Sequence, residues 1–164
     1  MTQKPKALSW LWLSGAIILL DWLSKLWALS RLTYLQSVEV IPGFWSWTLV
    51  HNTGAAFSFL ANAGGWQQWL FSALAVVISV VCVVMLKKTE RTSWRTALPL
   101  ALIIGGALGN LIDRVRFGYV IDFVHWYWRD HHWPVFNLAD SAITLAAILL
   151  IAFSFSADKK ADRP

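Results

Sequence analysis

Two aspartates stand where the sequence is otherwise almost entirely apolar. Asp122 lies between Ile121 and Phe123 in a strand-like run, and Asp140 comes just before the apolar stretch AITLAAILLIAF at 142–153. An ionised carboxylate in such a setting is costly unless it has a partner or a proton. When two carboxylates face each other, repulsion raises one pKa and the pair shares a proton. One member then acts as a base toward water and the other as an acid toward a peptide carbonyl, which predicts hydrolysis without metal if the two meet.

Other polar residues are expected at the same membrane depth as Asp140. Asp21 and Lys25 are four residues apart and share a helix face, with the acid N-terminal to the base. The run GNLIDR at 109–114 ends a further apolar segment, and Asn137 and Asp140 share a face at the start of the last one. Ionisable residues in such segments face the interior of a helix bundle and indicate function.

Each of these residues also has a purely structural interpretation. Asp21 and Lys25 are expected to form an ion pair, and Asn137 to cap the last helix through backbone N–H groups. Asp113 is expected to be a solvated charge at the interface, and Arg114 to snorkel or to pair with an acid. Asp122 and Asp140 remain as the candidates for chemistry.

The elements that position these residues are membrane helices. The chain has 164 residues, of which 57% are hydrophobic and 14% charged, and its mean hydropathy is +0.53. A soluble domain carries about 25% charged residues. The sequence therefore predicts an all-α membrane protein of one domain, 1–164, in which four segments are long enough to cross a bilayer: 8–29, 66–86, 96–111 and 138–155.

The distribution of Lys and Arg predicts the orientation of these segments. The N-terminal tail, the 87–95 loop and the C-terminal tail hold most of the cations: Lys4, Lys6, Lys87, Lys88, Arg91, Arg95, Lys159, Lys160 and Arg163. The outer segments 30–65 and 112–137 hold only Arg31, Arg114, Arg116 and Arg129. By the positive-inside rule both termini are expected to be cytoplasmic. The first span has no small-residue cleavage site after it, so it is expected to be a permanent helix.

The outer segments are expected to hold more than plain loops. Residues 32–50 and 119–128 are rich in β-branched and aromatic residues, and Pro42-Gly43 is a turn signal. We expect a small β-rich platform and an amphipathic element on the outer surface. Tryptophans near both membrane interfaces are typical of aromatic belts: Trp10, Trp12 and Trp94 at the inner interface, and Trp66, Trp69, Trp126, Trp128 and Trp133 at the outer one.

Competing chemistries have little support in the sequence. An H-E-x-x-H motif and a G-x-S-x-G elbow are both absent, and His125, His131 and His132 are better explained as an exposed loop than as a metal site. Ser24 and Lys25 are adjacent and point in different directions on a helix, so they do not form a dyad. We therefore expect no metal and no cofactor, and the scattered basic residues predict no nucleic-acid partner.

Five motifs in order resemble the bacterial lipoprotein signal peptidases, or signal peptidase II. They span nearly the whole chain: DWLSK at 21–25, NTGAAFSF at 52–59, GGALGNLIDR at 105–114, VIDF at 120–123 and FNLADS at 136–141. The resemblance implies an intramembrane aspartic endopeptidase with Asp122 and Asp140 as its catalytic pair. It further implies that a set of matching positions binds substrate or supports the site: Asn52, Gly54, Asn110, Arg114, Asn137, Asp21 and Lys25.

The resemblance also implies a substrate and a location. The substrates would be diacylglyceryl-modified prolipoproteins, cut just before the lipidated cysteine, and the inhibitor would be a globomycin-type cyclic peptide. The enzyme would lie in the bacterial cytoplasmic (inner) membrane, in contact with lipid, with its site near the extracytoplasmic face. A monomer is expected, since the chemistry needs one chain. The residues alone also allow a small proton-coupled transporter or a non-enzymatic membrane scaffold.

Overall fold

The computed structural model describes residues 5–54 and 65–161, with side chains up to Phe155 at the C-terminal end. Within these residues four helices are long and apolar enough to cross a membrane, which confirms the four predicted spans. The helices are α1 (Leu11–Arg31), α2 (Trp66–Lys88), α3 (Trp94–Phe117) and α4 (Leu138–Ala161), and a 3-10 turn, η1 (Ala7–Trp10), precedes α1.

Helix α3 is longer than the predicted span 96–111, and this difference matters for the site. The apolar pattern ends near Leu111, but the helix continues to Phe117 because its polar residues Asn110 and Asp113 are buried inside the protein. Gly118 ends the helix in the left-handed conformation, with φ of +79°, and its N–H bonds the carbonyl of Arg114. A glycine at this position is the usual way to close a helix. The polar residues that were expected at the interface therefore lie within the last turns of α3.

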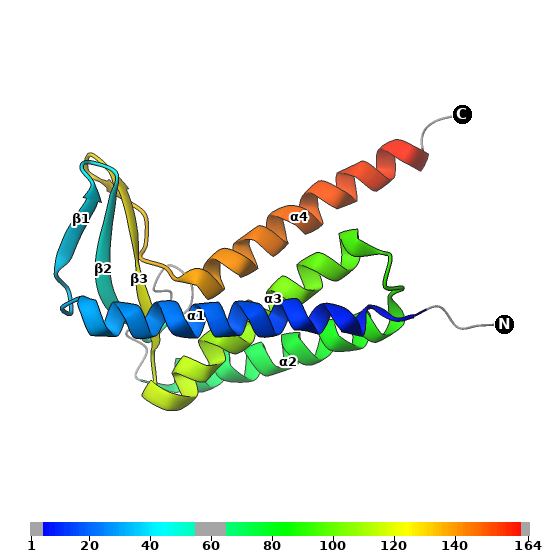
Figure 1. Ribbon diagram of the computed structural model, residues 1–164, viewed down its shortest axis with the longest axis horizontal. Coiled ribbons are helices and arrows are strands. Elements are labelled where there is room, and N and C mark those ends of the chain that lie inside the picture. The colour runs from blue at the N-terminus through cyan, green and yellow to red at the C-terminus, as the bar shows by residue number, and fades with distance from the viewer. Residues whose placement is uncertain (1–4, 55–64, 162–164) are drawn as a thin grey trace.

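Helix α3 is the central helix of the bundle, and α1, α2 and α4 all pack against it. Figure 1 shows α4 diverging from α1 and α2 toward its C-terminal end. Small residues on α3 allow the close packing. A Cβ added at Gly105 would lie 2.7 Å from the Cβ of Ile17, and one added at Gly106 would lie 2.5 Å from the carbonyl oxygen of Ala139. Glycines at such positions let helices approach closely.

An antiparallel sheet lies at one end of the bundle, opposite the end where α1 begins and α4 finishes (Figure 1). Its strands occur in the order β1 (Ser37–Ile41), β2 (Trp45–Asn52), β3 (Val120–Trp128) and β4 (His131–His132). The predicted β structure in the outer segments is thus confirmed, including a turn at Pro42 and Gly43. The amphipathic element is not found among the described residues, and residues 55–64 of this outer segment lie outside them.

The first half of β3 connects the sheet to the bundle. Residues Val120–Phe123 are buried, and Phe123 packs together with Trp47 of β2 and Trp27 of α1. After β4 the chain runs back alongside β3, and Phe136 exchanges backbone hydrogen bonds with Val124. This return places the start of α4 beside the buried half of β3. It is the step that brings Asp140 close to Asp122.

Candidate active site

Asp122 lies on β3 with its side chain enclosed by amide groups. Only 1% of the residue is exposed. The Nδ2 of Asn52 donates to its Oδ2 at 2.9 Å, and the Nδ2 of Asn137 donates to its Oδ1 at 2.7 Å. Burial, followed by the negative charge of the nearby Asp140, raises the pKa of Asp122 well above its ordinary value. The carboxyl group of Asp122 therefore holds its proton more tightly than a free aspartate does.

Asn137 joins Asp122 to Asp140. Its Oδ1 accepts from the backbone N–H of Asp140 at 2.9 Å, which makes it the N-cap of α4 as predicted. Asp140 points back, and its Oδ2 lies 3.4 Å from the backbone nitrogen of Asn137. The pattern is that of a capping box, with an acid three residues after the cap. One residue therefore begins α4, orients Asp140 and donates to Asp122.

Asn110 of α3 provides a second link between the polar groups. Its Nδ2 donates to the Oδ1 of Asp140 at 2.7 Å. Its Oδ1 accepts from the Nδ2 of Asn137 at 3.0 Å and from the Nζ of Lys25 at 3.1 Å. The Lys25 ammonium is thus linked to Asp140 by hydrogen bonds through the side-chain amide of Asn110. The oxygen and nitrogen of Asn110 are both engaged, which holds its orientation.

Lys25 is buried between two aspartates. Its Nζ lies 2.7 Å from Asp21 Oδ2 and 2.7 Å from Asp113 Oδ2, and all three residues are at most 3% exposed. The Asp21–Lys25 ion pair is therefore confirmed, but the expectation that Asp113 is a solvated charge is wrong. Asp113 is buried because it also accepts from the backbone N–H of Ile121, as Asp21 does from Ala139. These two bonds attach β3 and the start of α4 to the ion cluster.

Gly54 and Arg114 complete the surroundings of Asn52. The Oδ1 of Asn52 accepts from the backbone N–H of Gly54 at 2.9 Å, and the carbonyl of Gly54 accepts from Arg114 Nη2 at 3.0 Å. The Arg114 guanidinium also lies 5.5 Å from the ring centre of Phe71. Among the described residues Arg114 thus bonds a carbonyl and lies over an aromatic ring. Asp140 interacts with it through charge, so the expected pairing with an acid takes this form. Residues 55–59 of the NTGAAFSF motif lie outside the described structure.

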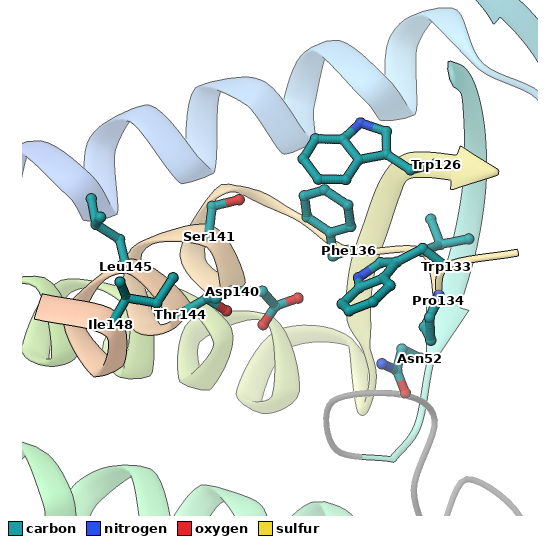
Figure 2. Close-up of a pocket in the computed structure, with 11 residues that line it drawn as sticks. Asn52, Trp126, Trp133, Pro134, Phe136, Asp140, Ser141, Thr144, Leu145 and Ile148 are labelled. Atoms are coloured by element: carbon teal, nitrogen blue, oxygen red, sulfur yellow. The ribbon is translucent and has the colours of Figure 1, made fainter. Parts of the chain in front are cut away.

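Two cavities meet at Asp140. The larger has a volume of about 340 Å³ and lies between α4 and the segment that returns from the sheet. Figure 2 shows the Asp140 carboxylate on the first turn of α4, near Phe136 and Trp133, with Leu145 and Ile148 further along the helix. The smaller, of about 200 Å³, lies between α2, α3 and α4 and includes Arg114. The walls of both are mainly apolar, so both suit hydrocarbon.

Three residues at the site were not found as site residues from the sequence. The sequence predicts Asp113 to be a solvated charge, although its three-residue spacing from Asn110 places the two on one helix face. Trp126 and Trp133 were assigned to the interfacial belt, and the structure places both in the wall of the larger cavity. No sequence signal separates a tryptophan that lines a cavity from one that faces lipid.

The described residues contain no group of three or more His, Cys, Asp or Glu side chains that could hold a metal ion. The site consists instead of two aspartates, three asparagines and a buried cation network. Such a site is suited to acid–base chemistry in which the carboxyl groups themselves transfer the protons.

The fold and the site thus define a multi-pass membrane protein with two linked aspartates beside apolar cavities. Residues 13–156 match the family described as Signal peptidase (SPase) II. A lipoprotein signal peptidase of Xanthomonas oryzae pv. oryzae is 55% identical over 93% of both chains. One from Xylella fastidiosa is 58% identical over 88% of this chain and 86% of its own. The chain therefore belongs to the signal peptidase II family and is a protease.

The fold agrees with solved structures. A bacterial membrane enzyme determined by the in meso method at 2.3 Å resolution superposes with a TM-score of 0.82 and 27% identity, covering 99% of this chain and 96% of that one. A second such enzyme, at 1.9 Å, gives a TM-score of 0.76 and 29% identity over 93% and 96% of the two chains. Membership in a protease family argues against the transporter and scaffold alternatives.

Proposed function

We propose that the protein is an intramembrane aspartic endopeptidase that removes signal peptides from diacylglyceryl-modified prolipoproteins by cutting just before the lipidated cysteine. The observation that carries this proposal is the Asn137 side chain. It binds Asp122 at 2.7 Å and the backbone of Asp140 at 2.9 Å, so the two acids belong to one hydrogen-bonded unit beside an apolar cavity. The curated relatives named lipoprotein signal peptidase support the substrate class.

In the proposed mechanism the two aspartates share one proton. The ionised member removes a proton from water, and the resulting hydroxide attacks the scissile carbonyl carbon. The protonated member donates to the carbonyl oxygen, and a proton then passes to the leaving nitrogen as the peptide bond breaks. The raised pKa of Asp122 and its two amide donors support its place in this pair. No covalent intermediate is required.

The cavities support a lipid-bearing substrate. Leu145, Ile148 and Phe136 give the larger cavity an apolar wall that suits acyl chains, and Asp140 lies in that wall. The smaller cavity is lined in part by Arg114. Its guanidinium is a hydrogen-bond donor, and a carbonyl of the substrate backbone is the acceptor we propose for it.

The proposed location is the bacterial cytoplasmic (inner) membrane, with the site near the extracytoplasmic face. The sheet lies at the end of the bundle opposite the start of α1 (Figure 1), and the basic tails favour a cytoplasmic position for that start. A monomer is the proposed state, because Asp122 and Asp140 are already linked through Asn137 of the same chain. A globomycin-type cyclic peptide is the inhibitor expected to occupy the same site.

The test is cleavage of a diacylglyceryl-modified prolipoprotein by the purified full chain in detergent. Asp122→Asn and Asp140→Asn keep the size of each side chain but remove its titration, so each should lower turnover by about 100-fold or more. Asp130→Asn is the matched control, because Asp130 is exposed in the turn between β3 and β4. Wild-type turnover in either site variant would assign that aspartate a structural role and refute the dyad.

A further inference from the structure

Two histidine rings meet on the polar face of the sheet. Tyr127 pairs with His132 across β3 and β4, so their side chains lie on the same face, as does His125, two residues before Tyr127. The Nε2 of His125 lies 3.1 Å from the Nδ1 of His132, and the ring centres are 5.2 Å apart with 25° between the planes. His132 is exposed, whereas His125 is partly buried. The pair is therefore accessible from solvent through His132.

Two hydroxyl groups lie beside the Nδ1 of His125. Its Nδ1 lies 3.3 Å from the Ser46 hydroxyl and 3.3 Å from the Thr48 hydroxyl, both on the neighbouring strand β2. In the tautomer with the proton on Nδ1, these hydroxyl oxygens accept from the ring. The lone pair of Nε2 then points toward His132. A ligating histidine in a metal site commonly has its second nitrogen held in this way.

We propose that His125 Nε2 and His132 Nδ1 form a binding site for a divalent cation of the Zn²⁺ or Cu²⁺ class, with water in the remaining coordination positions. Neutral imidazole is a preferred ligand of these ions. With bonds of 2.0–2.1 Å, two nitrogens on a tetrahedral zinc lie about 3.3–3.4 Å apart. The 3.1 Å between the histidine nitrogens needs only a small outward movement of His132, which its exposure permits.

This site is separate from the aspartates and does not rest on the proposed peptidase function. It joins β3 to β4 just before Trp133, so a bound cation would fix the turn that leads into the wall of the larger cavity. His131 is the natural control for the pair. It is adjacent to His132 but pairs with Trp128, and its side chain therefore lies on the opposite face of the sheet.

Any affinity tag is first removed from the full chain. The protein in detergent is then titrated with ZnCl₂, and binding is measured by calorimetry. The wild type and His131→Gln should bind one zinc ion per chain with equal affinity. His125→Gln and His132→Gln should bind at least about ten-fold more weakly, since even the loss of an outer partner costs about 10- to 100-fold in metal affinity. His132→Gln is the decisive variant, because its exposed side chain can be replaced without disturbing the sheet core.

A second measurement follows unfolding temperature with and without zinc. A cation that binds only the folded protein raises this temperature, so zinc should stabilise the wild type and His131→Gln but neither pair variant. The unfolding temperatures in EDTA show whether each variant is folded. The proposal is overturned if the wild type binds no zinc, if His132→Gln binds as well as the wild type, or if His131→Gln loses as much affinity as the pair variants.

Discussion

The Nδ2 of Asn137 lies 2.7 Å from the Oδ1 of Asp122, although the two residues belong to different elements. The same side chain caps α4 through its Oδ1, which accepts from the backbone of Asp140. The start of the helix and the position of the two acids are thus fixed by one amide. Different substitutions of Asn137 can therefore separate its structural role from its role in the site.

Asn137→Ser should separate capping from catalysis. Serine is also a good N-cap, so α4 should keep its start, but the amide donor to Asp122 is lost. A hydrogen bond of this kind contributes about 0.5–1.5 kcal/mol, so its loss should lower the free energy of unfolding by about that amount. It should also lower turnover by about 10-fold, because Asp122 loses one of its two amide donors. Asn137→Ala should lose the cap as well and lower the free energy of unfolding by about 0.5–2 kcal/mol more. Equal stability of the two variants would contradict the capping role.

Lys25→Met should destabilise the protein strongly, because it leaves Asp21 and Asp113 as unpaired carboxylates in a buried site. Removing one partner of a buried ion pair costs about 3–5 kcal/mol. Adding Asp21→Asn and Asp113→Asn to Lys25→Met removes the unpaired charges and should recover part of the lost stability. Thermal unfolding in detergent measures both effects. If Lys25→Met unfolds like the wild type, the three residues do not form a buried ion cluster.

Gly109→Ala should separate α3 from α1 and α4. The added Cβ would lie 2.8 Å from Asp21 Oδ2 and 3.3 Å from the Cβ of Ala139, in the middle of the packed site. Overpacking of this kind costs about 1–3 kcal/mol, and it should lower turnover because Ala139 is next to Asp140. Gly15→Ala is the matched control, since its Cβ would have nothing within 4 Å. A similar response of the two variants in unfolding and cleavage would contradict the close packing at Gly109.

The raised pKa of Asp122 predicts how stability depends on pH. The folded protein binds this proton more tightly than the unfolded chain, whose carboxyl group has the ordinary pKa of 3.8. The resulting contribution to stability is fully present below pH 3.8 and is lost as the pH rises through the raised pKa. Asp122→Asn lacks this group, so its unfolding temperature should fall less steeply than that of the wild type over the same rise in pH.

The measurement is thermal unfolding in detergent at a series of pH values, with Asp130→Asn as the control. Asp130 is exposed, so its variant should follow the wild-type curve. Parallel curves for the wild type and Asp122→Asn would mean that Asp122 has the same pKa in the folded and unfolded states.

The helices and the candidate residues of the site were predictable because their signals are local. The four apolar runs specify membrane spans by length and composition. The β-branched segments specify strands, and Asn137 specifies a cap three residues before an acid. Two aspartates in apolar surroundings indicated acid–base chemistry, since each needs a proton or a partner. The five motifs added the family.

The tertiary structure decided which polar groups meet. Asp113 has the same local sequence whether it is solvated or buried, and its burial depends on Lys25, 88 positions earlier in the chain. Asn52 and Asp122, 70 positions apart, are neighbours only because β2 pairs with β3. Such long-range contacts depend on the packing of helices and the register of strands, which no short segment encodes. The sequence by itself determined which side chains needed a partner, and only the fold decided which partner each received.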